Sequence, residues 1–543
     1  PIETAPKGVP LMQWEKDATE EAGLVKIDLL GNRSLGVIRD SIQSVIDAKG
    51  RFDDFDDLDP EDDFDTQQNV AQGNTMGCFY IESPATRLLQ KKSKIGDFEH
   101  VVIHSSIIRP AANEFIQEYL KRLHTGVWNP IHPMIEDVLD ETYGIMVYQE
   151  DVSKVAVKMA GFSHAKADGL RKIMSKKDKE QQLADYREQF SRGAMAKGVS
   201  KKDIRRVWDM IQSFSGYSFC KPHSASYARV SFQAAYLKTH YPAEFMAAVI
   251  SNQGGFYSTF AYVSEARRLG VTILEPDVNQ SDIRWQGHNF TLRVGLMAIK
   301  DLSANTMKAI VDQRSKKRFS SPIDFYNRTK PHEDEIRSLV HSGSLDCLMS
   351  SSGSTPDCRT KRTNCTNRAG LLWSFALFRK PGKSHDTGPS LFDSTPLAHG
   401  AAAGIPELPP ENPLDRLRRE FAVLGFLCSC HPIVLFADAI SRLNTVKAKD
   451  LPRFVNRTVS FAGWLITGKV VKTKKGDPMK FLTFEDETGI VETVFFPKPY
   501  ALFCHMLAYG KPYLITGKVD SNWGAVTVTV ENTRAISRSK VVS

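Results

Sequence analysis

The chain has 543 residues, enough for several domains, because single hydrophobic cores usually stop growing well below that length. Its hydrophobic content of 41% and charged content of 25% are ordinary for a soluble globular protein. The net charge of +8 is mild, but such an average can hide basic faces that bind phosphate. No run of about 18 apolar residues and no signal-peptide pattern occurs, which argues against a membrane span or a secreted protein.

The eight cysteines are scattered, and none forms a C-x-x-C pair. This usage predicts free thiols in a reducing cytosol, and therefore a cytoplasmic protein. The nearest approach to a zinc cluster is Cys428, Cys430 and His431, whose spacing is not that of the usual ligands. Because the chain begins with proline, we expect an internal piece of a longer protein.

The first informative stretch is "GLVKIDLLGNRSL", residues 23–35. A strand-like run carries Lys26 and Asp28, turns at Gly31 and enters a predicted helix. An acid beside a cation suggests a metal and phosphate site, although such a site needs more than one carboxylate. The acidic run that follows lacks the glycine and terminal glutamate of a calcium loop, so we expect a solvated helix-and-loop segment.

Residues 85–250 show helical periodicity, with Gly161 as a predicted helix end and Pro242 as a predicted boundary between two helices. The segment "GLRKIMSKKDKE" places several cations near the end of one helix: Arg171, Lys172, Lys176 and Lys177. Cations at this spacing can hold a triphosphate. They can equally be ordinary cations in the last turn of a helix, where they suit the helix dipole. Spacing alone does not separate the two interpretations.

A second anion site is predicted in "GYSFCKPHSASYA", residues 216–228. Lys221 and His223 precede Ser224, a good N-cap, so side chains and free amides would meet at a helix start. The alternative is that His223 is a buried structural histidine.

Residues 256–348 predict short strands and then paired helices joined by tight turns, a motif that can present backbone amides to phosphate. Residues 349–413 are rich in Ser, Gly, Pro and Thr and predict a linker around a short helix, "LLWSFALFRK". Within this linker, Leu391 and Phe392 form an apolar pair typical of docking peptides.

From about residue 455 the chain reads as five short strands, with a helix-like segment between the third and fourth, which predicts an OB-fold barrel. A cationic hairpin contributes Lys472, Lys474 and Lys475 for DNA phosphates. The aromatic residues Trp464, Phe481 and Phe484 are either base-stacking platforms or barrel core.

Taken together, these segments resemble one family, the bacterial DNA polymerase III alpha subunits of the C-family polymerases. The resemblance rests on "VKIDLLGNRSL", "TYGIMVYQEDV", "ADGLRKIMSKK", "GYSFCKPHSASYARVSFQAAYLKTHYPAEFMAAV", "RVGLMAIKDLS", "LVHSGSLD" and "GDPMKFLTFEDETGIVETVFFP", in the family's order. "IIRPAAN" is more similar to the error-prone branch. The resemblance covers nearly the whole chain and is weakest across 350–410.

The resemblance implies a multidomain α+β protein: the end of a polymerase palm, mostly α-helical fingers, a helix–hairpin–helix region and a C-terminal OB-fold β-barrel. The family's PHP domain, thumb and most of the palm would lie outside this chain. The expected divisions are palm 1–45, fingers 46–255, fingers end and helix–hairpin–helix 256–348, linker with clamp-binding peptide 349–413, connecting helical segment 414–454 and OB-fold 455–543.

By the same resemblance, Asp28 matches the third catalytic, metal-binding aspartate, and the other two belong upstream of residue 1. Further implied sites are the nucleotide or phosphate ligands Lys26, Arg171, Lys172, Lys176, Lys221 and His223, and the clamp-binding Leu391 and Phe392. The clamp peptide departs from the family's pattern, because Gly388 and Pro389 stand where a glutamine is usual.

The expected function is that of a DNA-directed DNA polymerase alpha-subunit portion that binds primer–template DNA and dNTP. Since two-metal phosphoryl transfer needs carboxylates that bridge both Mg²⁺ ions, this chain alone is expected to be inactive. The alternatives are one half of a split polymerase that requires a separate N-terminal half, or a non-catalytic DNA- or sliding-clamp-binding protein.

Overall fold

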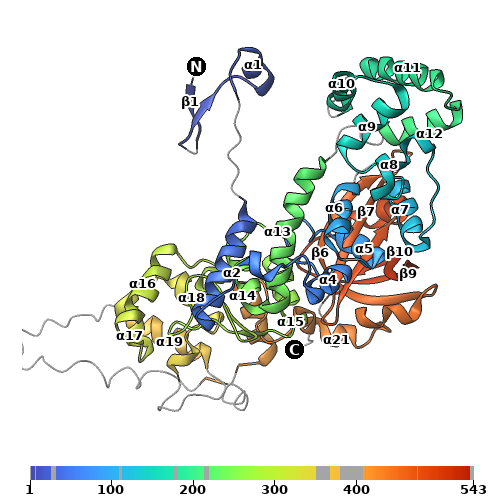
Figure 1. The fold of residues 1–543 in the computed structure, drawn as a ribbon. Coiled ribbons are helices and arrows are strands. Elements are labelled where there is room, and N and C mark those ends of the chain that lie inside the picture. Colours follow the sequence, from blue (N-terminus) through green and yellow to red (C-terminus); the bar gives the residue numbers. More distant parts are fainter. Residues whose placement is uncertain are drawn as a thin grey trace, which may run out of the picture.

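The computed structural model describes residues 2–6, 8–25, 32–108, 113–174, 180–212, 219–349, 367–379, 408–409, 411–473 and 475–537. The described part is mostly helical and ends in a closed β-barrel (Figure 1). None of the helices in these ranges combines the length and the apolar character needed to cross a bilayer. The predicted α+β fold class, with helix–hairpin–helix and OB-fold parts, is confirmed.

The N-terminal segment forms a hairpin, β1 (Ile2–Thr4) and β2 (Pro10–Met12), followed by α1 (Lys16–Glu21). It stands apart from the rest of the molecule in Figure 1. Several of its large apolar side chains are exposed, among them Ile2, Leu11 and Trp14. This segment therefore has little packing within the described structure.

The central body is a helical assembly around one large hydrophobic core. Its helices are α2 (Arg33–Lys49), α3 (Phe55–Leu58), α4 (Phe64–Ala71), α5 (Pro84–Ser93), α6 (Phe98–Ile107), α7 (Asn113–Thr125), α13 (Lys221–His240), α14 (Pro242–Asn252) and α15 (Thr259–Arg268). The apolar face of α13 is buried at Ala228, Phe232 and Ala235, as its spacing predicts. Pro242 begins α14, so the predicted helix boundary is also confirmed. The acidic run forms α3, α4 and loops.

A second lobe has its own core and consists of α8 (Glu136–Leu139), α9 (Gln149–Ala160), α10 (His164–Met174), α11 (Glu180–Ala196) and α12 (Lys201–Gln212). Trp208 is buried at its centre, with its ring 5.5 Å from that of Phe190. Helix α9 ends at Gly161, whose φ of 68° is in the left-handed region that glycine adopts without strain. The predicted stop is therefore correct.

A small sheet joins the central body to a set of short helices. Strands β3 (Thr272–Leu274), β4 (Gln286–His288) and β5 (Thr291–Arg293) are ordered β3-β5-β4. The helices are α16 (Ala304–Lys316), α17 (Pro322–Thr329), α18 (Glu333–His341) and α19 (Arg368–Arg379). Helix α19, expected as a short helix within a linker, packs on α17 and α18, and its buried Arg368 donates to Asp346 at 2.8 Å.

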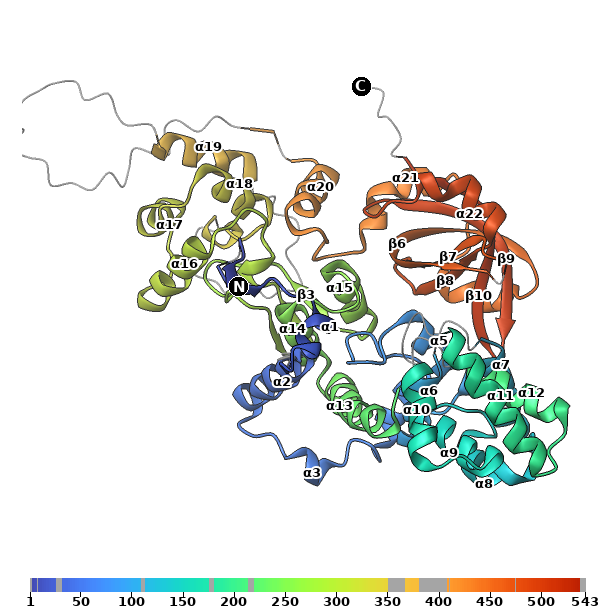
Figure 2. The same ribbon diagram turned by 90° about the horizontal axis from the view of Figure 1, so that it is seen from above.

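The barrel follows two connecting helices, α20 (Pro413–Leu424) and α21 (Ala437–Ile440). Its elements are β6 (Thr458–Lys472), β7 (Pro478–Glu485), β8 (Ile490–Phe495), α22 (Pro497–Phe503), β9 (Pro512–Asn522) and β10 (Ala525–Ala535). The strand order β10-β8-β7-β6-β9 closes the barrel, with a helix between the third and fourth strands as predicted. In Figure 2, α16–α19 lie at one end and the barrel and second lobe at the other, with α2, α13 and α14 between them.

Candidate nucleic-acid and nucleotide interface

Two of the predicted fingers cations, Arg171 and Lys221, contact the first residues of α9. The backbone N–H of Gln149, the first residue of α9, donates to the carbonyl of Phe219 just before α13, at 3.0 Å. Arg171 on α10 donates from Nη1 to Oε1 of Gln149 at 2.8 Å. The fold thus brings α10 beside the chain that leads into α13, although the two are separated by about 50 residues in the sequence.

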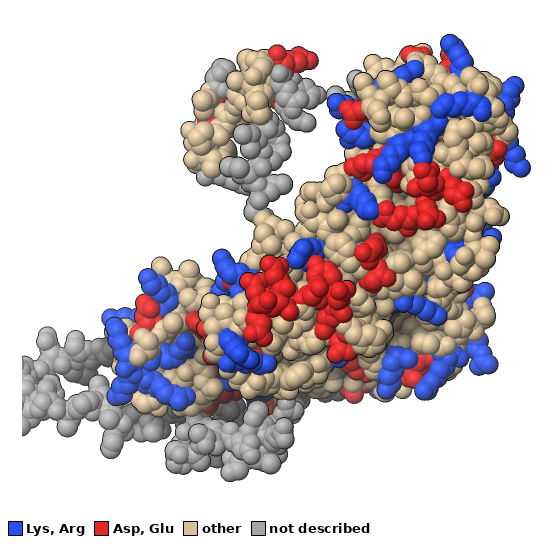
Figure 3. Space-filling view, viewed as in Figure 1, with Lys and Arg blue, Asp and Glu red and all other residues tan. Residues whose placement is uncertain are grey.

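Arg171, Lys172 and Lys221 each have an acidic partner. Arg171 and Lys172 both contact Asp168 at 2.9 Å. Hydrogen bonds from Lys172 and then Arg171 lower the pKa of Asp168 below its ordinary value. The ammonium of Lys221 donates to Glu141 at 2.7 Å, and both side chains are about half exposed. A phosphate-bearing ligand would therefore have to exchange with carboxylates. Figure 3 shows blue and red side chains side by side over this lobe.

Helix α13 begins earlier than predicted. Its first residue is Lys221, with Cys220 as the N-cap, so Ser224 lies buried inside the first turns instead of capping the helix. Pro222 explains the shift, because proline is favoured at the first helical positions. His223 is exposed, which excludes the buried structural alternative. Its ring lies 4.1 Å from that of Tyr227.

Tyr227 belongs to an aromatic cluster that sequence reasoning missed. The rings of Phe79 and Tyr80 each lie 5.1 Å from Tyr227, and Phe219 lies 6.0 Å from Tyr80. Tyr80 has a φ of 66°, a conformation that non-glycine residues rarely adopt and that often marks functional sites. The adjacent aromatics in "GCFYIES" are the available sequence signal, but nothing in that stretch indicates that they face α13.

Asp151 fixes the start of α9. Its carboxylate accepts the backbone N–H groups of Val147 and Tyr148, each at 2.9 Å. Burial raises the pKa of Asp151 to about 6, despite these hydrogen bonds. Since Gln149 and Glu150 are the first residues of α9, this cap orients the partners of both Arg171 and Lys221.

Asp151→Asn is expected to remove a pH dependence of stability. A pKa raised from 3.8 to about 6 means that the folded state binds the proton more tightly, so this stabilisation is complete below pH 3.8 and lost as pH rises through 6. The shift corresponds to about 3 kcal/mol at most. Urea titrations at pH 4 and pH 7.5 should show a smaller difference in unfolding free energy for the variant than for the wild type. Equal differences would contradict this assignment.

The barrel presents its predicted lysines on an exposed hairpin between β6 and β7. Lys472 and Lys475 are both exposed, and the next residue, Gly476, has a φ of 88° that suits the turn from β6 into β7. Antiparallel pairing places Lys469 opposite Phe481, and both side chains are exposed. Lys469 is a further cation that the sequence analysis missed, because the register that pairs it with an aromatic ring is decided by strand pairing.

The structure separates the three barrel aromatics. Phe484 is completely buried in the barrel interior, and Trp464 is 3% exposed against Phe260, Phe421 and Phe436. Only Phe481, at 45% exposure, can offer a ring to a base. Of the two interpretations that the sequence left open, core holds for Trp464 and Phe484, and a stacking platform remains for Phe481.

The barrel docks on the central body through a buried charge network. We call this the junction network; its members are Lys238, Glu265, Arg268 and Glu485. Glu265 contacts Lys238 at 2.7 Å and Arg268 at 3.0 Å. Arg268 contacts the fully buried Glu485 of β7 at 2.9 Å. Although burial opposes it, Arg268 and then His431 hold the pKa of Glu485 below its ordinary value. One end of the outer face of β7 is therefore covered by protein.

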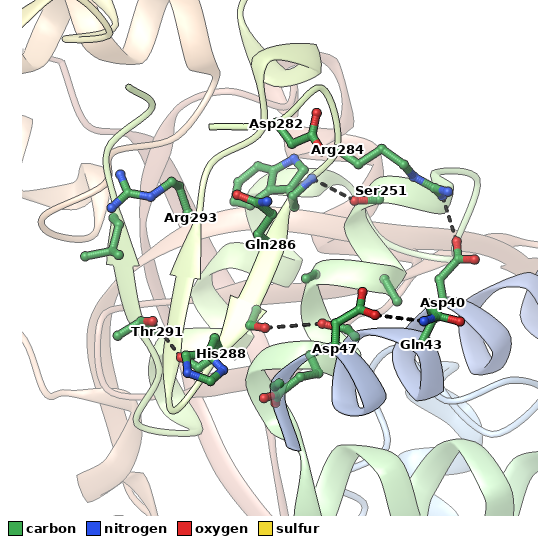
Figure 4. A pocket seen from close by; sticks show the side chains of 18 residues that line it. Asp40, Gln43, Asp47, Ser251, Asp282, Arg284, Gln286, His288, Thr291 and Arg293 are labelled. Carbon is green, nitrogen blue, oxygen red and sulfur yellow. Dashed lines mark hydrogen bonds and ion pairs between the residues drawn. The ribbon is translucent and has the colours of Figure 1, made fainter. Parts of the chain in front are cut away.

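A cavity of about 850 Å³ lies between α2, α14 and the β4–β5 hairpin (Figure 4). One opposite-charge pair lies in it, because Arg284 contacts Asp40 at 2.9 Å, whereas Arg293 donates to the neutral amide of Gln280 at 3.0 Å. The acidic residues in its lining outnumber the two arginines, so the cavity has no excess of positive charge for a phosphate. Asp47 accepts from Gln43 at 2.8 Å. We therefore assign no ligand to this cavity.

Several predicted residues lie outside the described ranges. These are Lys26, Asp28, Lys176, Lys177, Leu391, Phe392 and Lys474. Within the described ranges, no group of three or more His, Cys, Asp or Glu residues is placed to hold a metal ion. His431 of the improbable zinc cluster instead contacts Glu485 at 3.3 Å. The described residues thus do not fit a Mg²⁺ site.

Three family models match the chain. They are the bacterial DNA polymerase III alpha subunit finger domain over residues 34–198, a helix–hairpin–helix motif over 270–354 and an OB-fold nucleic acid binding domain over 459–536. The DNA polymerase III alpha subunit of Thermus aquaticus is 32% identical over 96% of this chain. The chain is homologous to bacterial DNA polymerase III alpha subunits. The family resemblance seen in the sequence is thereby confirmed.

Other relatives agree. The DNA polymerase III alpha subunit of Aquifex aeolicus is 32% identical over 95% of the chain, and the error-prone DNA polymerase of Symbiobacterium thermophilum is 28% identical over 99%. The alpha subunits of T. aquaticus and A. aeolicus are each covered over 42% of their length and the error-prone polymerase over 52%. The chain therefore spans about half the length of these relatives, which include both branches of the family.

Proposed function

We propose that this chain is a DNA- and nucleotide-binding portion of a DNA polymerase III alpha enzyme. The observation that carries the proposal is the exposed β6–β7 hairpin with Lys472 and Lys475, together with the exposed Phe481 opposite Lys469, on a barrel whose family binds nucleic acid. Cations for the backbone and a ring for a base are the usual means of binding single strands without sequence preference. The barrel would thus hold the unpaired template strand.

The fingers residues are proposed to receive the incoming dNTP. Arg171, Lys172, Lys221 and His223 surround the starts of α9 and α13, and Lys176 follows α10 in the sequence. The carboxylate partners of Arg171, Lys172 and Lys221 would keep these three side chains in place until a triphosphate replaces them. Lys26 and the metal ligand Asp28 would complete the site at the palm. The linker residues Leu391 and Phe392 are proposed to dock on a sliding clamp.

Residues 2–25 are proposed to contact a further polymerase segment. The support is the exposure of apolar side chains such as Ile2, Leu11 and Trp14, together with the share of the relatives' length that this chain does not span. Such uncovered apolar surface usually indicates a contact with other protein. That segment would also supply the two aspartates that the resemblance requires.

The decisive experiment is primer extension with Mg²⁺ and all four dNTPs. The 543-residue chain alone is expected to bind primer–template DNA but not to extend it, because only Asp28 matches the catalytic acids. Adding a purified N-terminal polymerase segment should restore extension, and Asp28→Asn should abolish the restored activity. Robust extension by the chain alone refutes the proposed division of the active site, and a chain that binds no DNA refutes the proposal itself.

Phe481→Ala is expected to weaken binding of single-stranded DNA by about 1–3 kcal/mol, the usual contribution of one base stacked on a ring. Phe496→Ala is a matched control, since that ring has similar exposure at the start of α22. Fluorescence anisotropy with labelled oligonucleotides measures both. If the two variants bind equally, Phe481 is not a stacking platform.

A further inference from the structure

A cavity of about 440 Å³ lies between the central helices and the barrel. Helices α4 and α5 form one wall, and β8, the start of β10 and residues 448–452 form the other. In OB-folds, strands two and three and the loop between strands four and five commonly bind oligonucleotides. Here β8 and the β9–β10 hairpin occupy those positions, so the cavity lies against a part of the barrel that is suited to nucleic acid.

Helix α5 lines this cavity with three cations, Arg87, Lys91 and Lys94. Arg87 and Lys91 are four residues apart and lie on one face of the helix, and Lys94 is its C-cap, with a φ of 61°. Arg87 is buried and donates to the carbonyl of Gly73 at 3.0 Å and the hydroxyl of Tyr257 at 3.2 Å. Lys91 and Lys94 are exposed at the opening. Cations at the end of a helix also suit its dipole, but that role requires no cavity.

Among the described residues, no ion pair is formed by Lys91 or Lys94. The one acid in the wall, Glu492, is engaged by the hydroxyl of Thr483 at 2.6 Å, and burial raises its pKa. Desolvation lowers the pKa of Lys91, which is the effect of a partly enclosed ammonium without a strong partner. The cavity thus has more positive than negative groups, in contrast to the cavity of Figure 4, in whose lining acidic residues outnumber arginines.

Two further features suit a nucleotide-bearing ligand. The β9–β10 hairpin reaches α5, so that a side chain on Gly524 would come within 3.7 Å of Nζ of Lys94. The preceding residue, Trp523, is 38% exposed and stacks on His124 with ring centroids 4.4 Å apart. An aromatic ring therefore stands beside the cationic opening, which is the usual combination for bases and phosphates.

We propose that this cavity is a phosphate-binding site in which α5 supplies the cations and the barrel supplies the opposite wall. Its ligand is the phosphate of a single-stranded nucleic acid or of a free nucleotide, which share this chemistry. If the ligand is a single-stranded nucleic acid, the inference rests on the proposed function and extends it. The template strand would then run from the β6–β7 hairpin to a second site built jointly by the barrel and the fingers.

The test compares Lys91→Gln/Lys94→Gln with the control Lys201→Gln/Lys202→Gln, which removes two exposed lysines from α12. Each full-length variant is titrated with labelled oligo(dT), dTTP and inorganic pyrophosphate over a salt series. For a strand, loss of two phosphate contacts predicts about 25-fold weaker binding at 0.1 M salt and a salt slope smaller by about 1.4. Loss of one binding site for dTTP and pyrophosphate, with oligo(dT) binding unchanged and the proposed dNTP site of the fingers retained, identifies a free nucleotide as the ligand.

Equal binding of all three probes by the double variant and its control overturns the inference. Lysine acetylation of the wild type gives a readout that does not depend on a folded variant: the bound probe should protect Lys91 and Lys94 but not Lys201. Failure of the proposed function is distinguishable, since it would abolish DNA binding in every variant while leaving the dTTP and pyrophosphate measurements to decide the cavity.

Discussion

Arg268→Met is expected to lower the free energy of unfolding by about 3–5 kcal/mol, the usual cost of removing one partner from a buried ion pair. Arg268 connects Glu265 of α15 with the fully buried Glu485 of β7, so its loss leaves a carboxylate without its principal partner. Urea titrations measure the stability. Limited proteolysis should show that the barrel separates from the fingers before the fingers unfold.

Two controls isolate the buried pair. Arg337→Met removes an exposed pair with Glu333 on α18 and should cost no more than about 1 kcal/mol. Arg268→Met/Glu485→Met should cost less than the sum of the two single changes, because no charge is then left unpaired at that position. A single variant that is as stable as the Arg337 control would contradict the proposed role of the junction network.

The same network predicts acid sensitivity. The folded-state pKa values of Glu265 and Glu485 are held below the ordinary value of 4.5, Glu265 chiefly by Lys238 and Glu485 by Arg268, against the opposing effect of burial. Their contribution to stability is therefore complete above pH 4.5 and is lost as pH falls below it. The barrel of the wild type should undock on acidification within this window.

The second large effect is expected at the hairpin. Lys472→Gln/Lys474→Gln/Lys475→Gln should weaken binding of single-stranded DNA about 100-fold at 0.1 M salt, since each lost phosphate contact contributes a factor of about 5. The slope of log affinity against log salt should fall by about 2. Anisotropy titrations from low to high salt measure both quantities.

The matched control is Lys447→Gln/Lys498→Gln/Lys518→Gln, which removes the same charge on or beside the barrel but outside the β6–β7 hairpin. If affinity depends on local contacts, only the hairpin variant should lose it. Equal losses in both variants would mean that overall charge, and not the hairpin, attracts DNA.

Docking of the barrel has a consequence for how DNA is held. The buried Glu485 and the cavity wall at Glu492 lie on strands β7 and β8, which OB-folds commonly use for oligonucleotides. In this protein the surface of β7 and β8 at these two residues faces the fingers, whereas the hairpin lysines Lys472 and Lys475 remain exposed. A strand that binds both must therefore touch two domains, so barrel docking and DNA binding become coupled.

The sequence alone determined the local elements and the family. Gly161 and Pro242 fixed helix limits because their backbone preferences act over one or two residues. Strand alternation identified the five-stranded barrel, and the ordered motifs identified the polymerase relatives. The predicted N-cap at Ser224 was wrong for a reason that is also local. Pro222 favours the first helical positions, so α13 begins before Ser224.

Only the tertiary structure decided which side chains face each other. It placed Arg171 beside the start of α13, joined Arg268 to Glu485 across more than 200 residues and set Lys469 opposite Phe481. It also buried Trp464 and Phe484 while exposing Phe481. Such pairings depend on packing and strand register between distant segments, and composition and periodicity carry no information about those distances.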